Sequence, residues 1–170
     1  MSTTSLIDPQ AAYKKLLETL REHANEWSNP AIVGVANGGV ELARRIRDDL
    51  LPDSPVGILN LTFHRDDIAL KPIPKDFMAT DIPFDVDDRT ILLVDDVFAT
   101  GRSARAALNE LFDYGRPQQV CLAVLVDIDQ RLLPIHPDFS GHQTQLGAGE
   151  KVHVSLNSKT RELRIEIEHS

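Results

Sequence analysis

The most informative segment of the chain is Ile91-Leu92-Leu93-Val94-Asp95-Asp96-Val97-Phe98-Ala99-Thr100-Gly101-Arg102-Ser103. Its apolar beginning is typical of a buried strand, and Asp95 and Asp96 follow where we expect that strand to end. A short turn with Thr100 and Gly101 then leads to Ser103, where a helical pattern begins. The segment therefore predicts a strand, a turn and a helix, with two carboxylates at the carboxyl end of the strand.

The turn after the acidic pair has the chemistry of a phosphate site. Backbone N–H groups and the positive end of the helix dipole attract anions at a helix N-terminus. Thr100 and Ser103 add hydroxyl donors, and Gly101 lets the backbone approach closely. Two carboxylates beside a phosphate are repulsive unless they accept hydrogen bonds from sugar hydroxyls or face a divalent cation. A phosphorylated ribose with Mg²⁺ meets all these conditions.

Strand and helix patterns alternate on both sides of this segment. Helical spacing of apolar residues and short apolar runs predict these elements: helices at 8–27, 39–50 and 103–114, and strands at 31–35, 56–63, 90–94 and 119–126. Two alternating runs, 152–156 and 163–167, predict an antiparallel hairpin. The alternation indicates an α/β fold with a mostly parallel sheet, which binds ligands at the carboxyl ends of its strands.

Residues 64–83 interrupt this pattern. They contain Arg65, Asp66, Asp67, two lysines and three prolines. A polar segment of this length in a compact domain is usually a functional or flexible loop. Residues 64–83 are therefore expected to form such a loop.

The composition fits one domain with one core. The 170 residues are 42% hydrophobic, and no apolar run approaches the roughly 18 residues of a membrane span. The N-terminus has no secretory pattern, so we expect a cytoplasmic protein without membrane contact. The six histidines are too scattered to predict a metal cage, and Cys121 lies in an apolar run that favours a core position.

The charge disfavours extensive nucleic-acid binding. The formal net charge is -8, and each segment of the chain is slightly negative. The densest basic cluster, Arg44, Arg45 and Arg47, is followed directly by Asp48 and Asp49, which favours a solvated helix face. RNA binding would require these arginines, with Arg105 or Arg116, to gather on one face of an oligomer.

Residues 91–103 resemble the phosphoribosyl pyrophosphate signature of type I phosphoribosyltransferases. A wider resemblance, over about 31–156, is to the PyrR family of pyrimidine-operon regulators and uracil phosphoribosyltransferases. Four further stretches carry it: 34–40 at the place of the pyrophosphate loop, 63–67 at the base of the flexible loop, 106–117, and 124–135, which matches the region that holds uracil.

The resemblance implies a single type I phosphoribosyltransferase domain over 1–170, with a mostly parallel sheet flanked by helices, and a small hood and C-terminal hairpin over 128–170. It implies transfer of a phosphoribosyl group from phosphoribosyl pyrophosphate to uracil with Mg²⁺, giving UMP and pyrophosphate. Dimers or tetramers are expected. Regulation of pyrimidine genes in response to UMP, through leader RNA, is a further expectation.

The resemblance also assigns site residues. Asp95 and Asp96 hold the ribose hydroxyls and, with Arg65, form the catalytic set; the same two acids hold Mg²⁺ indirectly, through the substrate. The 5'-phosphate is wrapped by Val97, Phe98, Ala99, Thr100, Gly101, Arg102 and Ser103. The pyrophosphate loop is Ala36, Asn37, Gly38 and Gly39. The base-binding residues are Val126, Asp127 and Arg131.

Two departures from the family pattern bear on activity. The family's pyrophosphate loop usually offers threonine and arginine, where this chain has Ala36, Asn37 and Gly38. Of the family's Arg-Gly-His-Arg after Asp127, only Arg131 remains. We therefore expect weakened pyrophosphate contacts and low turnover, with nucleotide binding retained.

Two other functions stay open at this stage. A purine phosphoribosyltransferase resembling the hypoxanthine-guanine enzymes would carry an acid just before Thr100-Gly101, and this chain has Ala99 there. A nucleotide-sensing RNA regulator with little catalysis is favoured by the altered pyrophosphate loop and disfavoured by the lack of basic excess. For Arg65, a surface ion pair with Asp66 or Asp67 is the alternative to a catalytic role.

Overall fold

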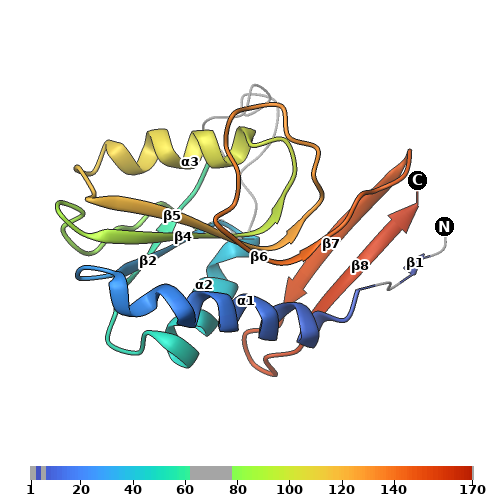
Figure 1. The fold of residues 1–170 in the computed structure, drawn as a ribbon, viewed down its shortest axis with the longest axis horizontal. Coiled ribbons are helices and arrows are strands. Elements are labelled where there is room, and N and C mark those ends of the chain that lie inside the picture. The colour runs from blue at the N-terminus through green and yellow to red at the C-terminus, as the bar shows by residue number, and fades with distance from the viewer. Residues whose placement is uncertain (1–2, 5–6, 62–77, 170) are drawn as a thin grey trace.

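A computed structural model describes residues 3–4, 7–61 and 78–169 of the chain. Five strands form the main sheet, and every neighbouring pair in it is parallel (Figure 1). In spatial order they are β3 (Val56–Leu59), β2 (Ala31–Val35), β4 (Thr90–Phe98), β5 (Gln119–Asp127) and β6 (Phe139–Gln143). The predicted α/β class with a mostly parallel sheet is confirmed.

Three helices cover the two faces of this sheet. The first, α1 (Pro9–His23), begins after Asp8, whose carboxylate accepts the N–H groups of Gln10 and Ala11, and a 3-10 turn, η1 (Ala24–Glu26), extends it. Together with α2 (Gly38–Leu50) it packs on one face, while α3 (Arg102–Phe112) packs on the other (Figure 1). The buried strands therefore supply alternate side chains to two cores.

A smaller antiparallel sheet stands beside the main one (Figure 1). It consists of β1 (Thr3–Thr4), β8 (Leu163–His169) and β7 (Glu150–Leu156). The predicted C-terminal hairpin is confirmed. Its buried side chains, Leu163, Ile165 and Ile167, join the core under α1 and α2. The strand β1 was not expected from the sequence.

Two strands, β4 and β3, end at other residues than predicted, and a third strand, β6, was not predicted. The central strand β4 runs to Phe98 instead of Val94, because β5 continues to pair with it through Val97 and Phe98. The acidic pair therefore lies inside β4, and the expectation that it follows the strand was wrong. The strand β6 was not predicted, because Pro137 and Gly141 are residues typical of turns and interrupt the alternation expected of a strand. Gly141 packs closely on the backbone of Ala12.

The strand β3 ends at Leu59 instead of Phe63. The next residue, Asn60, leaves the sheet and is held by a hydrogen bond from its N–H to Thr80 Oγ1 at 2.9 Å. Residues 62–77 lie outside the described part of the chain, and with them Arg65 and most of the predicted flexible loop. Its flexibility stays a prediction. In the part of the chain that is described, no helix is long and apolar enough to cross a bilayer.

Candidate active site

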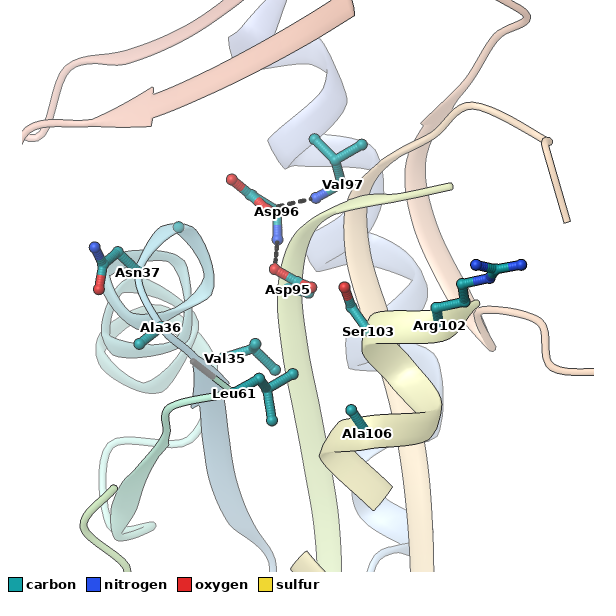
Figure 2. Close-up of a pocket in the computed structure, with 11 residues that line it drawn as sticks. Val35, Ala36, Asn37, Leu61, Asp95, Asp96, Val97, Arg102, Ser103 and Ala106 are labelled. Carbon is teal, nitrogen blue, oxygen red and sulfur yellow. Dashed lines mark hydrogen bonds between the residues drawn. The ribbon is translucent and has the colours of Figure 1, made fainter. Parts of the chain in front are cut away.

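The acidic segment and the predicted pyrophosphate loop meet at one cavity (Figure 2). This cavity, of about 410 Å³, opens where the carboxyl ends of β2 and β4 face the start of α3. Its lining residues are Val35, Ala36, Asn37, Gly38, Leu61, Asp95, Asp96, Val97, Arg102, Ser103 and Ala106. Parallel α/β sheets place their ligands at this edge, so the topology brings together two segments that are distant in the sequence.

A smaller cavity, of about 80 Å³, adjoins the first and shares Asp95, Val97 and Ser103 with it. Its other lining residues are Phe98, Ala99, Thr100, Gly101, Ala104, Leu122 and Val124. Every residue from Asp95 to Ser103 therefore lines one or both cavities. The predicted phosphate-binding residues form one continuous wall.

The turn from Ala99 to Arg102 is fixed by backbone geometry. Gly101 has a φ of 97°, in the left-handed region that favours glycine. The hydroxyl of Thr100 accepts the N–H of Arg102 at 3.2 Å, and its own O–H stays able to donate to a ligand. The first N–H groups of α3 have no partner within the helix, so the turn supplies the donors that a phosphate needs.

The two carboxylates of the acidic pair occupy different surroundings. Asp95 Oδ1 accepts the N–H of Asp96 at 2.8 Å, and Asp96 Oδ1 accepts the N–H of Val97 at 2.8 Å. In Figure 2 the Asp95 carboxylate faces Ser103 at the start of α3. The Asp96 carboxylate instead lies against Gly38, where a Cβ atom would overlap it. The pair therefore presents acceptors to both sides of the cavity.

The acidity of Asp95 is strongly perturbed. Burial of its carboxyl group raises the pKa well above the usual value of 3.8, and the nearby charge and side chain of Asp96 raise it further. The carboxyl group is enclosed although the residue as a whole is only half-buried. Strongly perturbed acids in a cavity are common at functional sites.

The predicted pyrophosphate loop contributes backbone and one amide side chain. Ala36, Asn37 and Gly38 line the larger cavity, whereas Gly39 packs against the carbonyl of Val94. The peptide bond between Ala36 and Asn37 is cis. Among the described residues that line this cavity, Arg102 carries the only basic side chain. The loop thus lacks the charged contacts that a diphosphate would otherwise receive from it.

The predicted base-binding residues lie next to the phosphate turn but line neither cavity. Val126 and Asp127 end β5, and the buried Asp127 accepts the N–H of Asp129 at 2.9 Å. Arg131 is exposed in the following loop. That loop is held to the phosphate turn by two backbone hydrogen bonds, Ile128 N–H to Phe98 O at 3.0 Å and Leu132 N–H to Thr100 O at 2.9 Å.

Six lining residues were not expected from the sequence. These apolar parts of the walls are Val35, Leu61, Ala104, Ala106, Leu122 and Val124. Their side chains carry no reactive group, so no motif marks them. The only available signal was position, since Val35 ends a predicted strand directly before the pyrophosphate loop. Arg65, the predicted catalytic arginine, lies outside the described residues.

The residues at the cavity fit Mg²⁺ only together with a substrate. Within the described ranges there is no group of three or more acidic, histidine or cysteine side chains that could hold a metal ion. Mg²⁺ needs an octahedral shell of oxygen atoms, and two neighbouring carboxylates are too few to complete it. A Mg²⁺ ion here would take its other ligands from water and substrate phosphates, which suits the indirect role expected for Asp95 and Asp96.

Comparison with known proteins defines the class. The family model described as phosphoribosyl transferase domain matches residues 2–155. A solved purine phosphoribosyltransferase from Pyrococcus horikoshii is 26% identical, with a TM-score of 0.60 over 80% of this chain and 82% of that one. A hypoxanthine-guanine phosphoribosyltransferase from Bacillus anthracis has a TM-score of 0.66 at 15% identity, over 82% of this chain and 83% of that one, and shares the fold alone. The molecule has the type I phosphoribosyltransferase fold.

Sequence relatives define the family more narrowly. The Bifunctional protein PyrR of Ralstonia nicotianae is 46% identical over 155 residues, which are 88% of this chain and 87% of the relative. The proteins of the same name from Pseudomonas entomophila and Nitrosococcus oceani are 39% and 45% identical, over 89% and 76% of this chain and 89% and 75% of the relatives. The chain belongs to the PyrR family, as its resemblance had indicated.

Proposed function

We propose that the chain transfers the 5-phosphoribosyl group of phosphoribosyl pyrophosphate to N1 of uracil, giving UMP and pyrophosphate. The observation that carries this proposal is the shared cavity: Asp95, Asp96, Arg102 and Ser103 face the loop 35–38 across it. A ribose with phosphates at both ends requires this combination, because its hydroxyls need acceptors and its phosphates need donors on either side.

The reaction needs no nucleophile from the protein. Breaking the bond between C1' and the pyrophosphate leaves positive charge on the sugar and negative charge on the leaving group. The protein therefore acts by positioning and by fixed electrostatics. We assign Asp95 and Asp96 to the ribose hydroxyls, where their charge also favours the developing positive sugar. Bound Mg²⁺ would neutralise part of the charge on the leaving pyrophosphate.

The 5'-phosphate is assigned to the turn from Val97 to Ser103. All residues of this turn except Arg102 line the smaller cavity, and backbone N–H groups with the hydroxyls of Thr100 and Ser103 are the donors that they can offer. On the opposite side, residues 36–38 offer backbone groups and the Asn37 amide in place of basic side chains. We expect slow turnover for this reason. Arg65 is proposed to add positive charge on that side, and Val126, Asp127 and Arg131 to hold the base.

Uracil is preferred to a purine on two grounds. The relatives of highest identity described above are PyrR proteins, whereas the purine enzymes are alike mainly in fold. In addition, Ala99 precedes Thr100 and Gly101, so the turn has no acid to receive a purine. The side chain of Ala99 lines the smaller cavity without offering a hydrogen bond.

A pyrophosphate-release assay tests the substrate assignment. Uracil, hypoxanthine and guanine are each supplied with phosphoribosyl pyrophosphate and Mg²⁺, and UMP formation is checked by chromatography. We expect release with uracil only, and loss of release when Mg²⁺ is chelated. Release with guanine or hypoxanthine and not with uracil would overturn the assignment.

A second role as a UMP-responsive regulator is also proposed, since the relatives are named bifunctional. The arginines considered for RNA do not meet within one chain: Arg44, Arg45 and Arg47 are on α2, while Arg105 is on α3 across the sheet. An RNA surface would therefore need an oligomer, for which a dimer or tetramer is proposed. The cytoplasmic location stays a prediction.

A further inference from the structure

A second hollow lies between α2 and the turn of the β7–β8 hairpin. Its volume is about 200 Å³, and it shares no residue with the cavities at the acidic pair. The lining residues are Glu41, Arg44, Arg45, Arg47, Asp48, Leu156, Asn157, Ser158 and Arg161. Four arginines face the two lining carboxylates and the nearby Asp49, which leaves an excess of one positive charge in a chain of net charge -8.

The carboxylates use only some of the arginine donors. Arg44 pairs with Glu41 at 2.6 Å, and Arg47 Nε donates to Asp48 at 3.0 Å. Arg161 stands 3.6 Å from Asp48 and 3.7 Å from Asp49, too far for a hydrogen bond. Because each guanidinium carries several N–H donors, further donors remain around the hollow for a ligand.

Arg45 is held in place, yet one of its donors is unused. Its guanidinium lies over the ring of Tyr13, 4.2 Å from the centroid, and Nη1 donates to the carbonyl of Arg161 at 3.4 Å. Its Nε is buried and has no hydrogen-bond partner among the described residues, because Asp49 is 3.9 Å away. A buried N–H without a partner is costly, so Arg45 keeps a donor that the described residues leave unused.

We infer that the hollow binds a phosphate-class anion, either free diphosphate or the terminal phosphates of a nucleotide. Guanidinium groups match phosphate oxygens in geometry and charge. The volume is below the roughly 300 Å³ at which pockets enclose whole small molecules, so a nucleoside would remain outside. The site is separate from the proposed active site, and α2 is the element that reaches both, with Gly38 at one end and Asp48 near the other.

The test follows the side-chain Nε–H signals of Arg44, Arg45, Arg47 and Arg161 by NMR while inorganic pyrophosphate is added to the whole protein. We expect a saturable shift of these signals. Replacing two charged donors, in R44Q/R47Q, is expected to weaken this binding by roughly tenfold or more. Both arginines pair within α2, so the hairpin contacts through Arg161 are retained and the fold is expected to persist.

Two variants serve as controls. R164Q removes an arginine that is exposed on β8 and pairs with Glu162 outside the hollow, and it should leave the titration unchanged. D95N/D96N removes the acidic pair at the other site and should also leave it unchanged, which separates this inference from the proposed reaction. R161K keeps the charge but loses the planar fork, so it should weaken binding without undoing the ion pairs to α2.

Other results would overturn the inference. Shifts that never saturate and that sodium chloride reproduces at equal ionic strength would show general screening. An unchanged affinity in R44Q/R47Q would place the anion elsewhere, and a short RNA that shifts these signals when pyrophosphate does not would show a nucleic-acid surface. If pyrophosphate shifts these signals, a parallel titration with ADP is compared with it. Tighter binding of ADP would indicate the terminal phosphates of a nucleotide, and tighter binding of pyrophosphate would indicate free diphosphate.

Discussion

The absence of a side chain at Gly38 determines where the carboxylate of Asp96 can lie. Gly38 is the first residue of α2, and a Cβ atom there would overlap the Asp96 carboxyl group. The φ of Gly38 is outside the left-handed region, so the backbone itself would accept alanine. Substitution at this residue therefore moves Asp96 without straining the chain.

We predict that G38A weakens the binding of phosphoribosyl pyrophosphate by roughly tenfold, the cost of one misplaced charge-assisted hydrogen bond. The melting temperature should not fall, because alanine favours helices over glycine. Calorimetric titration and thermal unfolding measure the two effects. In a D96A background, G38A should have no further effect on affinity, since it acts through that carboxylate.

G147A is the matched control for this substitution. A Cβ atom at Gly147 would meet only Glu150, at an ordinary distance of 3.4 Å or more. Its effect on affinity should be undetectable. A further loss from G38A in the D96A background would show that Gly38 acts on another group.

The raised pKa of Asp95 predicts a pH dependence of stability. Folding keeps this carboxyl protonated to higher pH than in the unfolded chain, where its pKa is near 3.8. Between pH 3.8 and the raised pKa the folded state therefore holds more protons than the unfolded chain, so the free energy of unfolding falls as the pH rises through this range. The side chain introduced by D95N is uncharged at every pH, so this variant should not show the fall in the free energy of unfolding that Asp95 causes.

Urea denaturation of D95N and the wild type at about pH 4 and about pH 8 measures this effect. D95N is expected to be the more stable protein at the higher pH, and the difference should shrink toward the lower pH. A difference that is the same at both pH values would show that the Asp95 carboxyl is not destabilised by its surroundings.

Among the structural elements, those with a complete periodic pattern could be predicted from the sequence. The helices α1, α2 and α3, the buried strand β2 and the β7–β8 hairpin fall within a few residues of expectation. Their apolar spacing matches the period of the element, and that spacing is a local property. The lining of the candidate site could be predicted in part, since residues 95–103 form one motif and all line the two cavities.

Elements that depend on a neighbouring strand could not be predicted. The carboxyl end of β4 contains Asp95 and Asp96, which are poor strand formers, and it is kept extended by pairing with β5. The strand β6 contains few apolar residues, and its extended conformation depends on its parallel pairing with β5. The apolar wall formed by Leu61 likewise depends on the position of the chain after β3.

The packing of α1 against α2 rests partly on one polar contact. The Tyr13 hydroxyl donates to Asp49 Oδ2 at 2.8 Å, while its ring supports Arg45. We predict that Y13F lowers the free energy of unfolding by about 1 kcal/mol, the usual net value of one such hydrogen bond. Chemical denaturation measures this change.

Tyr114 provides the control for that measurement, because it lies just after α3 and its side chain is exposed. Y114F should leave the free energy of unfolding unchanged. Equal effects of the two substitutions would show that the contact between Tyr13 and Asp49 does not hold the helices together.

At the scale of the whole molecule, charge limits how nucleic acid can bind. The net charge is -8, and the arginines of α2 and α3 lie on opposite faces of the sheet. Phosphate contacts from basic residues make RNA affinity fall steeply with salt. We predict that binding to a pyrimidine-operon leader RNA is weak and is lost at moderate salt.

Gel-shift titration at two salt concentrations, with and without UMP, measures this property. A basic-faced PyrR relative serves as the reference for affinity. Tight, UMP-dependent binding that resists salt would contradict the prediction and would point to a basic surface created by assembly.

The central claim is that the cavity between the acidic pair and the loop 35–38 binds the phosphoribosyl group. Calorimetric titration of phosphoribosyl pyrophosphate and UMP into the wild type and D95N/D96N tests it, with D87N/D88N as a control pair outside the cavity. We predict binding of both ligands to the wild type and to the control, and none to D95N/D96N, which should still unfold cooperatively. Unchanged affinity in a cooperatively folded D95N/D96N protein would contradict the claim.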